Sequence, residues 1–155
     1  MMNVEYVESI ELAAPASAAW RVVSDITSLP TVLSGMTALV IEGGDPTPRV
    51  GLAWNQTRVI AGRSGSERLE ITSLDDGRSY VTTGGGHGIE YVCTWTVEQI
   101  APATSRLTFT FTGVPHGALA RLSLRLFGAW GARATREAMR TDLHDIAAAV
   151  EGDRL

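Results

Sequence analysis

Apolar and polar residues alternate at the start of the chain. Between residues 4 and 12 the even positions are apolar apart from Glu8, and the odd positions are mostly polar. A period of two is typical of a half-buried strand, and it places Glu8 on the apolar side. Pro15 then suits the first turn of a helix in which Trp20 and Val23 face inward. A short second helix is expected to run from Leu29 to Leu33 and to end at Gly35.

The middle of the chain predicts six further strands and no long helix. They cover Met36–Glu42, Val50–Ile60, Glu67–Ser73, Arg78–Thr83, Ile89–Gln99 and Arg106–Thr112. Asp75-Asp76-Gly77 is typical of a tight hairpin, with glycine where a positive φ is needed. Gly62-Arg63-Ser64-Gly65 predicts another turn, and the glycine-rich run Gly84–Gly88 is expected to link two strands.

The last part of the chain predicts one long amphipathic helix. Its apolar residues recur at helical spacing and are Leu119, Leu122, Leu126, Trp130, Met139, Leu143, Ile146 and Val150. Gly128 and Gly131 predict a bend or a break in it. The expected fold is α+β: a curved seven-stranded antiparallel sheet wrapped around the segment from about Gly117 to Val150. The space inside such a fold usually holds a small apolar molecule.

Composition indicates one domain over residues 1–155. A chain of this length buries about two thirds of the surface that its unfolded form exposes. The single Cys93 rules out a disulfide within the chain and a thiolate zinc site, which favours a reducing compartment, so we expect a cytoplasmic protein. No apolar run approaches the roughly 18 residues of a membrane span.

Charge narrows the possible partners and cofactors. The net charge is −4, and no Lys/Arg stripe is interleaved with aromatic residues, which argues against nucleic acid. All 13 basic residues are Arg, which excludes Schiff-base chemistry and lysine-held cofactors. The run Gly84–Gly86 precedes no predicted helix, so it does not predict a phosphate or dinucleotide site. We therefore expect no cofactor and, since no residues show metal-ligand spacing, no metal.

The strand Val50–Ile60 carries the best candidates for chemistry. Alternation places Trp54, Gln56 and Arg58 on one face, which should be the concave one. Gln56 and Arg58 would then be polar groups in a mostly apolar cavity and would need partners. A ligand oxygen or the Glu8 or Glu70 carboxylate could supply one. Alternatively, Arg58 forms a structural ion pair or lies on the convex face.

Aromatic residues of two later strands predict an apolar wall for the cavity. Trp95 in one strand and Phe109 and Phe111 in the next alternate with threonines, which indicates a sheet with one wet face. The candidate ligand-binding residues are Trp54, Gln56, Arg58, Cys93, Trp95, Phe109, Phe111, Trp130 and His87. For each aromatic residue the alternative is plain core packing. For His87 the alternative is that the surrounding glycines serve unusual backbone angles and that the histidine contacts no ligand.

The other two histidines are weaker candidates. His116 follows Pro115 just before the last helix and is either near a cavity opening or a solvated turn residue. His144 lies beside Asp142 and Asp145, which are expected on the exposed side of the helix. The paired carboxylates therefore predict no acid–base site, and no catalytic residue is assigned.

The order of strand, two helices, six strands and long helix resembles the START-like, or Bet v 1-like (SRPBCC), superfamily. Within it the chain resembles the bacterial polyketide cyclase/dehydrase and lipid-transport group. The matching pieces are Ile10–Pro15 with Trp20 and Asp25, Gly51–Arg58, Trp95–Glu98 and Asp142–Ile146. The likeness spans nearly the whole chain and implies a helix-grip fold. One departure is that Pro30 is followed by Thr31-Val32-Leu33, where the family often has an aromatic residue.

Three functions remain open. The first is a module that binds a small hydrophobic molecule, such as a lipid, a polyketide or an aromatic metabolite, between the sheet and the last helix. The second is a cyclase or aromatase in which Arg58 or His87 polarises a carbonyl or moves a proton; cyclisation of a reactive chain needs mostly orientation. The third is a homodimeric interaction scaffold with a filled core. Binding is preferred, because no position combines a titratable group with an unambiguously buried environment.

Overall fold

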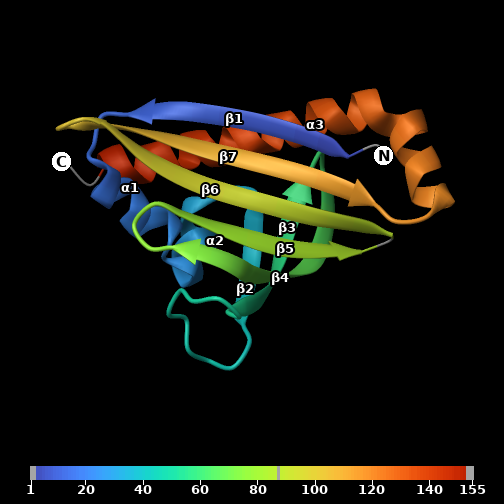
Figure 1. Ribbon diagram of the computed structural model, residues 1–155, viewed down its shortest axis with the longest axis horizontal. Coiled ribbons are helices and arrows are strands. Elements are labelled where there is room, and N and C mark those ends of the chain that lie inside the picture. Colours follow the sequence, from blue (N-terminus) through green and yellow to red (C-terminus); the bar gives the residue numbers. More distant parts are fainter. Residues whose placement is uncertain (1–2, 87, 153–155) are drawn as a thin grey trace.

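The computed structural model describes residues 3–86 and 88–152, with the backbone alone for residues 123–130. Its elements are β1 (Val4–Leu12), α1 (Ala16–Val23), η1 (Ile26–Ser28), α2 (Leu29–Val32), β2 (Met36–Ile41), β3 (Ala53–Ile60), β4 (Arg63–Asp75), β5 (Ser79–Gly86), β6 (Ile89–Ala101), β7 (Thr104–Pro115) and α3 (Ala118–Gly152). Figure 1 shows them in chain order by colour. The order predicted from the sequence is confirmed.

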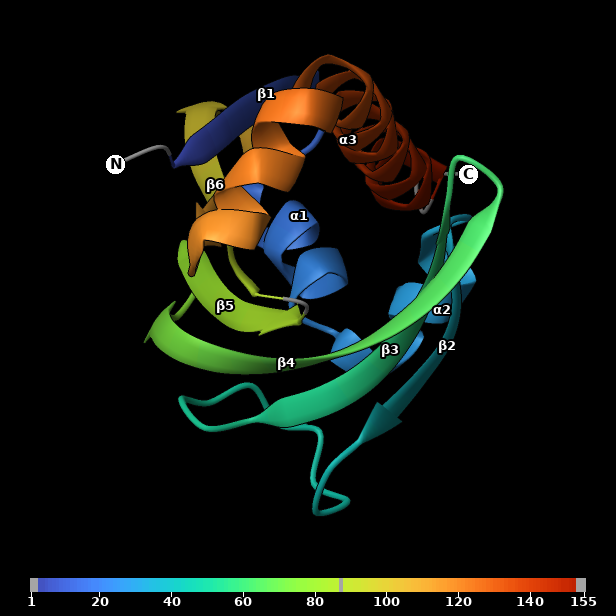
Figure 2. The same cartoon turned by 90° about the vertical axis from the view of Figure 1, so that its right-hand side faces the viewer.

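The strands form one antiparallel sheet in the order β1-β7-β6-β5-β4-β3-β2. The chain therefore begins at one edge, crosses to the other through α1 and α2, and returns strand by strand. Figure 2 shows the sheet curving around α3, with α1 and α2 inside the curve. This is the helix-grip arrangement that the sequence predicted. An antiparallel sheet of this kind has one packed and one solvated face, which explains the alternation of its sequence.

The glycine-rich run is part of the sheet rather than a link. Residues Gly84–Gly86 are the last three of β5, so the prediction of a connection there was wrong. A Cβ atom on Gly84 would lie 2.6 Å from the Arg68 carbonyl oxygen of β4, and one on Gly85 would overlap the Ile89 carbonyl oxygen of β6. Glycine is required here because neighbouring strands approach closely. Likewise β4 begins at Arg63, within a segment predicted as a turn.

The C-terminal half of α3 packs on the sheet as predicted. Met139, Leu143, Ile146 and Val150 are all buried in the core. The helix is continuous, and its first turns bend away from the rest at the end of the sheet (Figures 1 and 2). Leu119 and Leu122 are consequently 78% and 50% exposed, so their predicted place in the apolar contact was wrong. Leu126 and Trp130 have side chains outside the described residues.

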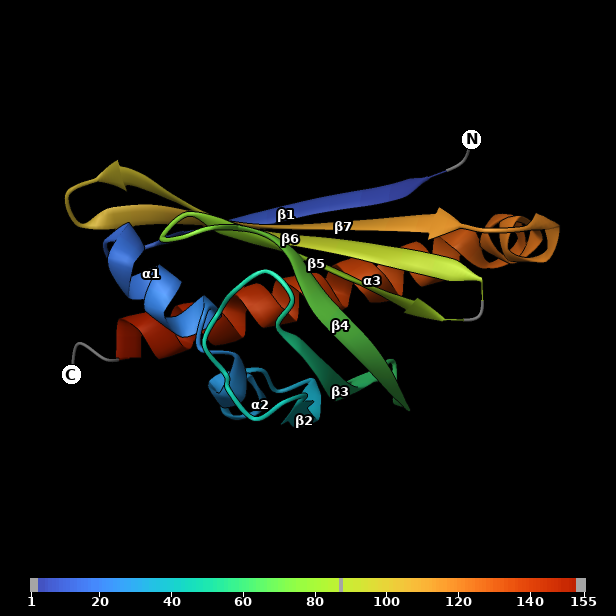
Figure 3. The ribbon, with the colours of Figure 1, turned by 60° about the horizontal axis from the view of Figure 1, so that its bottom comes forward.

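Helix α1 closes one end of the space between sheet and helix. It lies beside the C-terminal turns of α3, at the opposite end from the N-terminus of the chain (Figure 3). The buried Tyr80 hydroxyl donates a hydrogen bond of 2.7 Å to the Val23 carbonyl oxygen, and the Tyr80 ring packs edge to face on Trp20. The core is therefore filled beneath α1, and any open space must lie toward the other end of the sheet.

Candidate functional site

A cavity of about 740 Å³ lies between the concave face of the sheet and α3. Its volume is in the range of small-molecule sites. Seven of the candidate residues lie on its wall: Trp54, Gln56, Arg58, Cys93, Trp95, Phe109 and Phe111. The wall is completed by α2 and by small residues of α3, among them Gly131, Ala132 and Thr135. His87 and the side chain of Trp130 lie outside the described residues. That these residues bind a ligand stays a prediction.

Aromatic pairs make up much of the sheet side of this wall. The rings of Trp95 and Phe109, which are paired across β6 and β7, have centroids 4.0 Å apart. Phe111 contacts Tyr91 with centroids 5.3 Å apart and stacks on Tyr6 at 6.3 Å. Such pairs hold one another in place and present flat apolar surface to the cavity. Core packing and lining are therefore not exclusive alternatives here.

A chain of hydrogen bonds runs from the core to the cavity along β3 and β4. The Trp54 Nε1–H donates to Gln56 Oε1 at 3.0 Å, and Gln56 Nε2 donates to Glu67 Oε1 at 3.2 Å. Gln56 and Glu67 are directly paired in the sheet, so their side chains leave it on the same face. Burial raises the pKa of Glu67, although its hydrogen bond from Gln56 and the charge of Arg58 both lower it.

Arg58 forms a buried ion pair with Asp142 of α3. Its Nη2 atom lies 2.6 and 2.8 Å from the two carboxylate oxygens, and the side chains are only 16% and 3% exposed. Asp142 was predicted on the exposed side of the helix, which is wrong. Burial raises the pKa of its carboxyl, and the charge and hydrogen bond of Arg58 oppose that shift. The pair joins β3 to α3 across the cavity wall.

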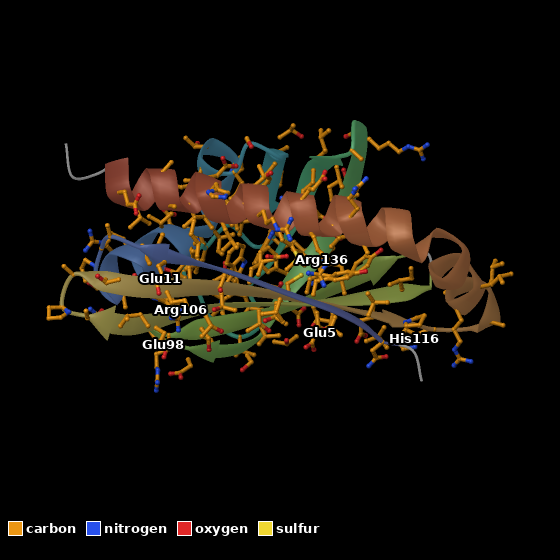
Figure 4. The ribbon with its side chains drawn as sticks, turned by 90° about the horizontal axis from the view of Figure 1, so that it is seen from above. Glu5, Glu11, Glu98, Arg106, His116 and Arg136 are labelled. Atoms are coloured by element: carbon orange, nitrogen blue, oxygen red, sulfur yellow. The ribbon has the colours of Figure 1, made fainter. Side chains whose placement is uncertain are left out.

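The partners predicted for Arg58 are engaged elsewhere. Glu8 accepts contacts of 3.4 and 3.2 Å from Arg136 and Arg140 of α3, and Glu70 pairs with Arg68 on the outer face of the sheet. Of the alternatives left open by the sequence, a structural ion pair is the one the structure shows. Figure 4 shows Arg136 between α3 and β1, where its guanidinium also lies 5.1 Å from the centre of the Tyr6 ring.

Three of the candidate residues are not placed for chemistry: Cys93, His144 and His116. Burial raises the pKa of Cys93 to about 12, which favours the neutral thiol at physiological pH. His144 is exposed on α3, as expected. His116 is exposed as well, and its backbone N–H donates to the Gly88 carbonyl oxygen just beyond the paired ends of β6 and β7.

Neither a metal site nor a membrane span is found in the described part of the chain. Within residues 3–86 and 88–152, no three His, Cys, Asp or Glu side chains are grouped so that they could hold a metal ion. None of the helices described there is both long enough and apolar enough to cross a membrane.

The pH dependence of the ion pair can be predicted from its geometry. Arg58→Met leaves the Asp142 carboxylate buried without a cation, so its pKa should rise further above the usual value. A raised pKa in the folded state means that the ionised carboxyl costs stability, and this cost falls as pH drops through the raised value. The loss of stability in Arg58→Met should therefore be smaller at mildly acidic pH than at neutral pH. Urea unfolding of the variant and the wild type at both pH values would measure it, and an equal loss at both would contradict the prediction.

A curved sheet that grips one long helix, with a cavity between the two, is the arrangement of a helix-grip domain. The family model described as polyketide cyclase / dehydrase and lipid transport matches residues 3–151, and the chain belongs to that family. The fold is that of the wider Bet v 1-like superfamily, as the sequence resemblance implied. No curated protein matches the chain.

Several solved structures share this fold at low sequence identity. The Zhui aromatase/cyclase from Streptomyces sp. R1128 has a TM-score of 0.78 at 14% identity, over 97% of this chain and 94% of that one. The protein TTHA0849 from Thermus thermophilus has a TM-score of 0.79 at 15% identity, over 97% and 99%. Norcoclaurine synthase from Thalictrum flavum has a TM-score of 0.76 at 16% identity, over 96% and 94%. At these identities the likeness establishes the fold alone.

Proposed function

We propose that this protein binds a small, flat, largely hydrophobic molecule in the cavity between the sheet and α3. The observation that carries the proposal is the cavity of about 740 Å³ with a wall of paired aromatic rings and few polar groups. Burial of apolar ligand surface supplies the affinity in such a site, and the few polar groups set the orientation. Residues 1–155 act as a single ligand-binding domain in this proposal.

An uncharged fluorescent probe tests the proposal directly. N-phenyl-1-naphthylamine should bind, quench tryptophan emission from Trp54 and Trp95, and raise the melting temperature, because it stabilises the folded state alone. Thr135→Trp places a large ring on the cavity wall and should abolish binding while the protein stays folded. The matched control is His144→Trp on the exposed side of the same helix, which should bind like the wild type. If the wild type does not bind the probe, the cavity is no binding site.

A cyclase or aromatase that uses the same cavity is the second candidate. The family assignment and the titratable groups on the wall, Arg58, Glu67 and Asp142, favour it. Orientation of a reactive chain within a shaped pocket would supply most of the acceleration. The distinguishing measurement compares products of a poly-β-ketone substrate with and without the protein. A carrier leaves the rate and ring pattern of the spontaneous reaction unchanged, whereas a cyclase changes at least one of them.

The third candidate, a dimeric scaffold with a filled core, has less support. A cavity of about 740 Å³ between the sheet and α3 does not favour a core that side chains fill completely. Sedimentation of the purified protein would report a homodimer, and cavity binding does not depend on that result.

A further inference from the structure

Two carboxyl groups lie on the described part of the cavity wall, and they differ in their partners. Asp142 is held by Arg58 through both of its oxygens. Glu67 accepts one hydrogen bond among the described residues, on Oε1 from Gln56. It precedes Leu69 and Ile71 on the inner face of β4 and is half-buried beside Tyr91 and Cys93, whose pKa values its charge helps to raise. Glu67 thus reaches the cavity without a cation bound to it among the described residues.

The orientation of Glu67 is fixed from the core outward. The Trp54 indole can only donate, so Gln56 must turn its carbonyl oxygen toward Trp54 and its amide group toward Glu67. Gln56 is only 5% exposed, so water is not positioned to replace either of these two hydrogen-bond partners. The result is a carboxylate that is anchored through Oε1 and has Oε2 available as an acceptor.

The charges around Glu67 disfavour an anionic ligand. Arg58 is the cation within the wall, and the Asp142 carboxylate already neutralises it at 2.6 and 2.8 Å. Arg63, the other arginine of the described wall, is exposed at the start of β4, where solvent weakens its charge. A ligand carboxylate would therefore meet the Glu67 charge in a largely apolar space, with its own hydration lost.

We propose, on the basis of the function proposed above, that Glu67 selects ligands by accepting a hydrogen bond from them. The ligand class is a flat, uncharged molecule with a hydroxyl group, such as a phenol or an enol, and its O–H donates to Glu67 Oε2. Lipids that end in a carboxylate are rejected. A hydrogen bond from a hydroxyl group to an ionised carboxylate is stronger than one between neutral groups. We therefore expect a large difference in affinity between ligands with and without the hydroxyl group.

Two naphthalene probes with the same ring test this selectivity. At neutral pH 2-naphthol is uncharged and carries the donor, whereas 2-naphthoate carries a carboxylate. Wild-type protein should bind 2-naphthol at least about tenfold more tightly, as expected for a hydrogen bond to a charged group. Glu67→Gln should reduce this ratio to about threefold or less, because the neutral amide no longer repels the anion. Glu70→Gln is the matched control on the outer face of the same strand and should keep the wild-type ratio.

The outcomes separate this proposal from the proposed function. Equal or tighter binding of 2-naphthoate by the wild type overturns the role of Glu67, and so does an unchanged ratio in Glu67→Gln. If N-phenyl-1-naphthylamine still binds in either case, the cavity function stands and the selectivity alone is wrong. If that probe does not bind to the wild type, the cavity function itself has failed. An equal or inverted wild-type ratio overturns the role of Glu67 even where the Glu67→Gln variant does not fold.

Discussion

Asp142→Ala should lower the free energy of unfolding by about 3–5 kcal/mol, because it leaves the Arg58 guanidinium buried without a counter-charge. The Arg58 side chain is 16% exposed, and its Nη2 atom directs both of its short contacts to Asp142. Solvent can therefore replace little of what the carboxylate supplied. Urea unfolding at neutral pH, followed by tryptophan fluorescence, would measure the loss.

Two further variants give this prediction its controls. Glu137→Ala removes an exposed carboxylate from the same helix and should change stability by less than about 0.5 kcal/mol. The double variant Arg58→Met with Asp142→Leu removes both charges and should recover most of the loss, since an apolar pair of similar volume often replaces a buried ion pair without cost. A loss below about 1 kcal/mol in Asp142→Ala would mean that water reaches the pair freely.

The fold was predictable because the two periods in the sequence are long and regular. A period of two predicted the strands, and helical spacing from Met139 to Val150 predicted the packed part of α3. The errors at Gly84–Gly86 have a clear cause. Glycine usually marks a turn, but here it lets β5 lie close to β4 on one side and to β6 on the other, and composition alone does not show how closely paired strands approach. The bend of α3 exposed Leu119 and Leu122 for a similar reason, since spacing alone does not show where the sheet ends.

Seven of the residues on the cavity wall were named from the sequence, and the two acidic residues that were missed there share a signal. Glu67 lies two residues before Leu69, on the inner face of a strand. Asp142 lies three residues after Met139 and four before Ile146, on the buried face of α3. Both are acidic residues in phase with an apolar pattern, as Glu8 is in β1. The spacing of the apolar residues could therefore have placed both carboxyl groups on the inner face. Their partners could not be predicted in this way, because they depend on which strand and helix meet in space.

Deletion of Leu119–Leu155 should abolish cooperative folding, the largest effect expected for any change considered. It removes the buried Met139, Leu143, Ile146 and Val150 and uncovers the inner face of the sheet, including Trp54, Ile71 and Leu107. A bare apolar face of this extent makes an isolated sheet prone to aggregate. The truncated chain should accumulate in the insoluble fraction, and any soluble part should show no cooperative thermal transition by circular dichroism.

Because α3 bends, its two ends should contribute unequally to the stability that this deletion removes. Its first turns lie beyond the packed face, so Leu119→Ser combined with Leu122→Ser should change the free energy of unfolding by less than about 1 kcal/mol, as surface substitutions usually do. Leu143→Ala, in the buried half, should cost about 2–5 kcal/mol through lost burial and a residual void. If the truncated chain were soluble and melted cooperatively, the sheet would be stable by itself, and α3 would act as a cover for the cavity rather than as half of the core.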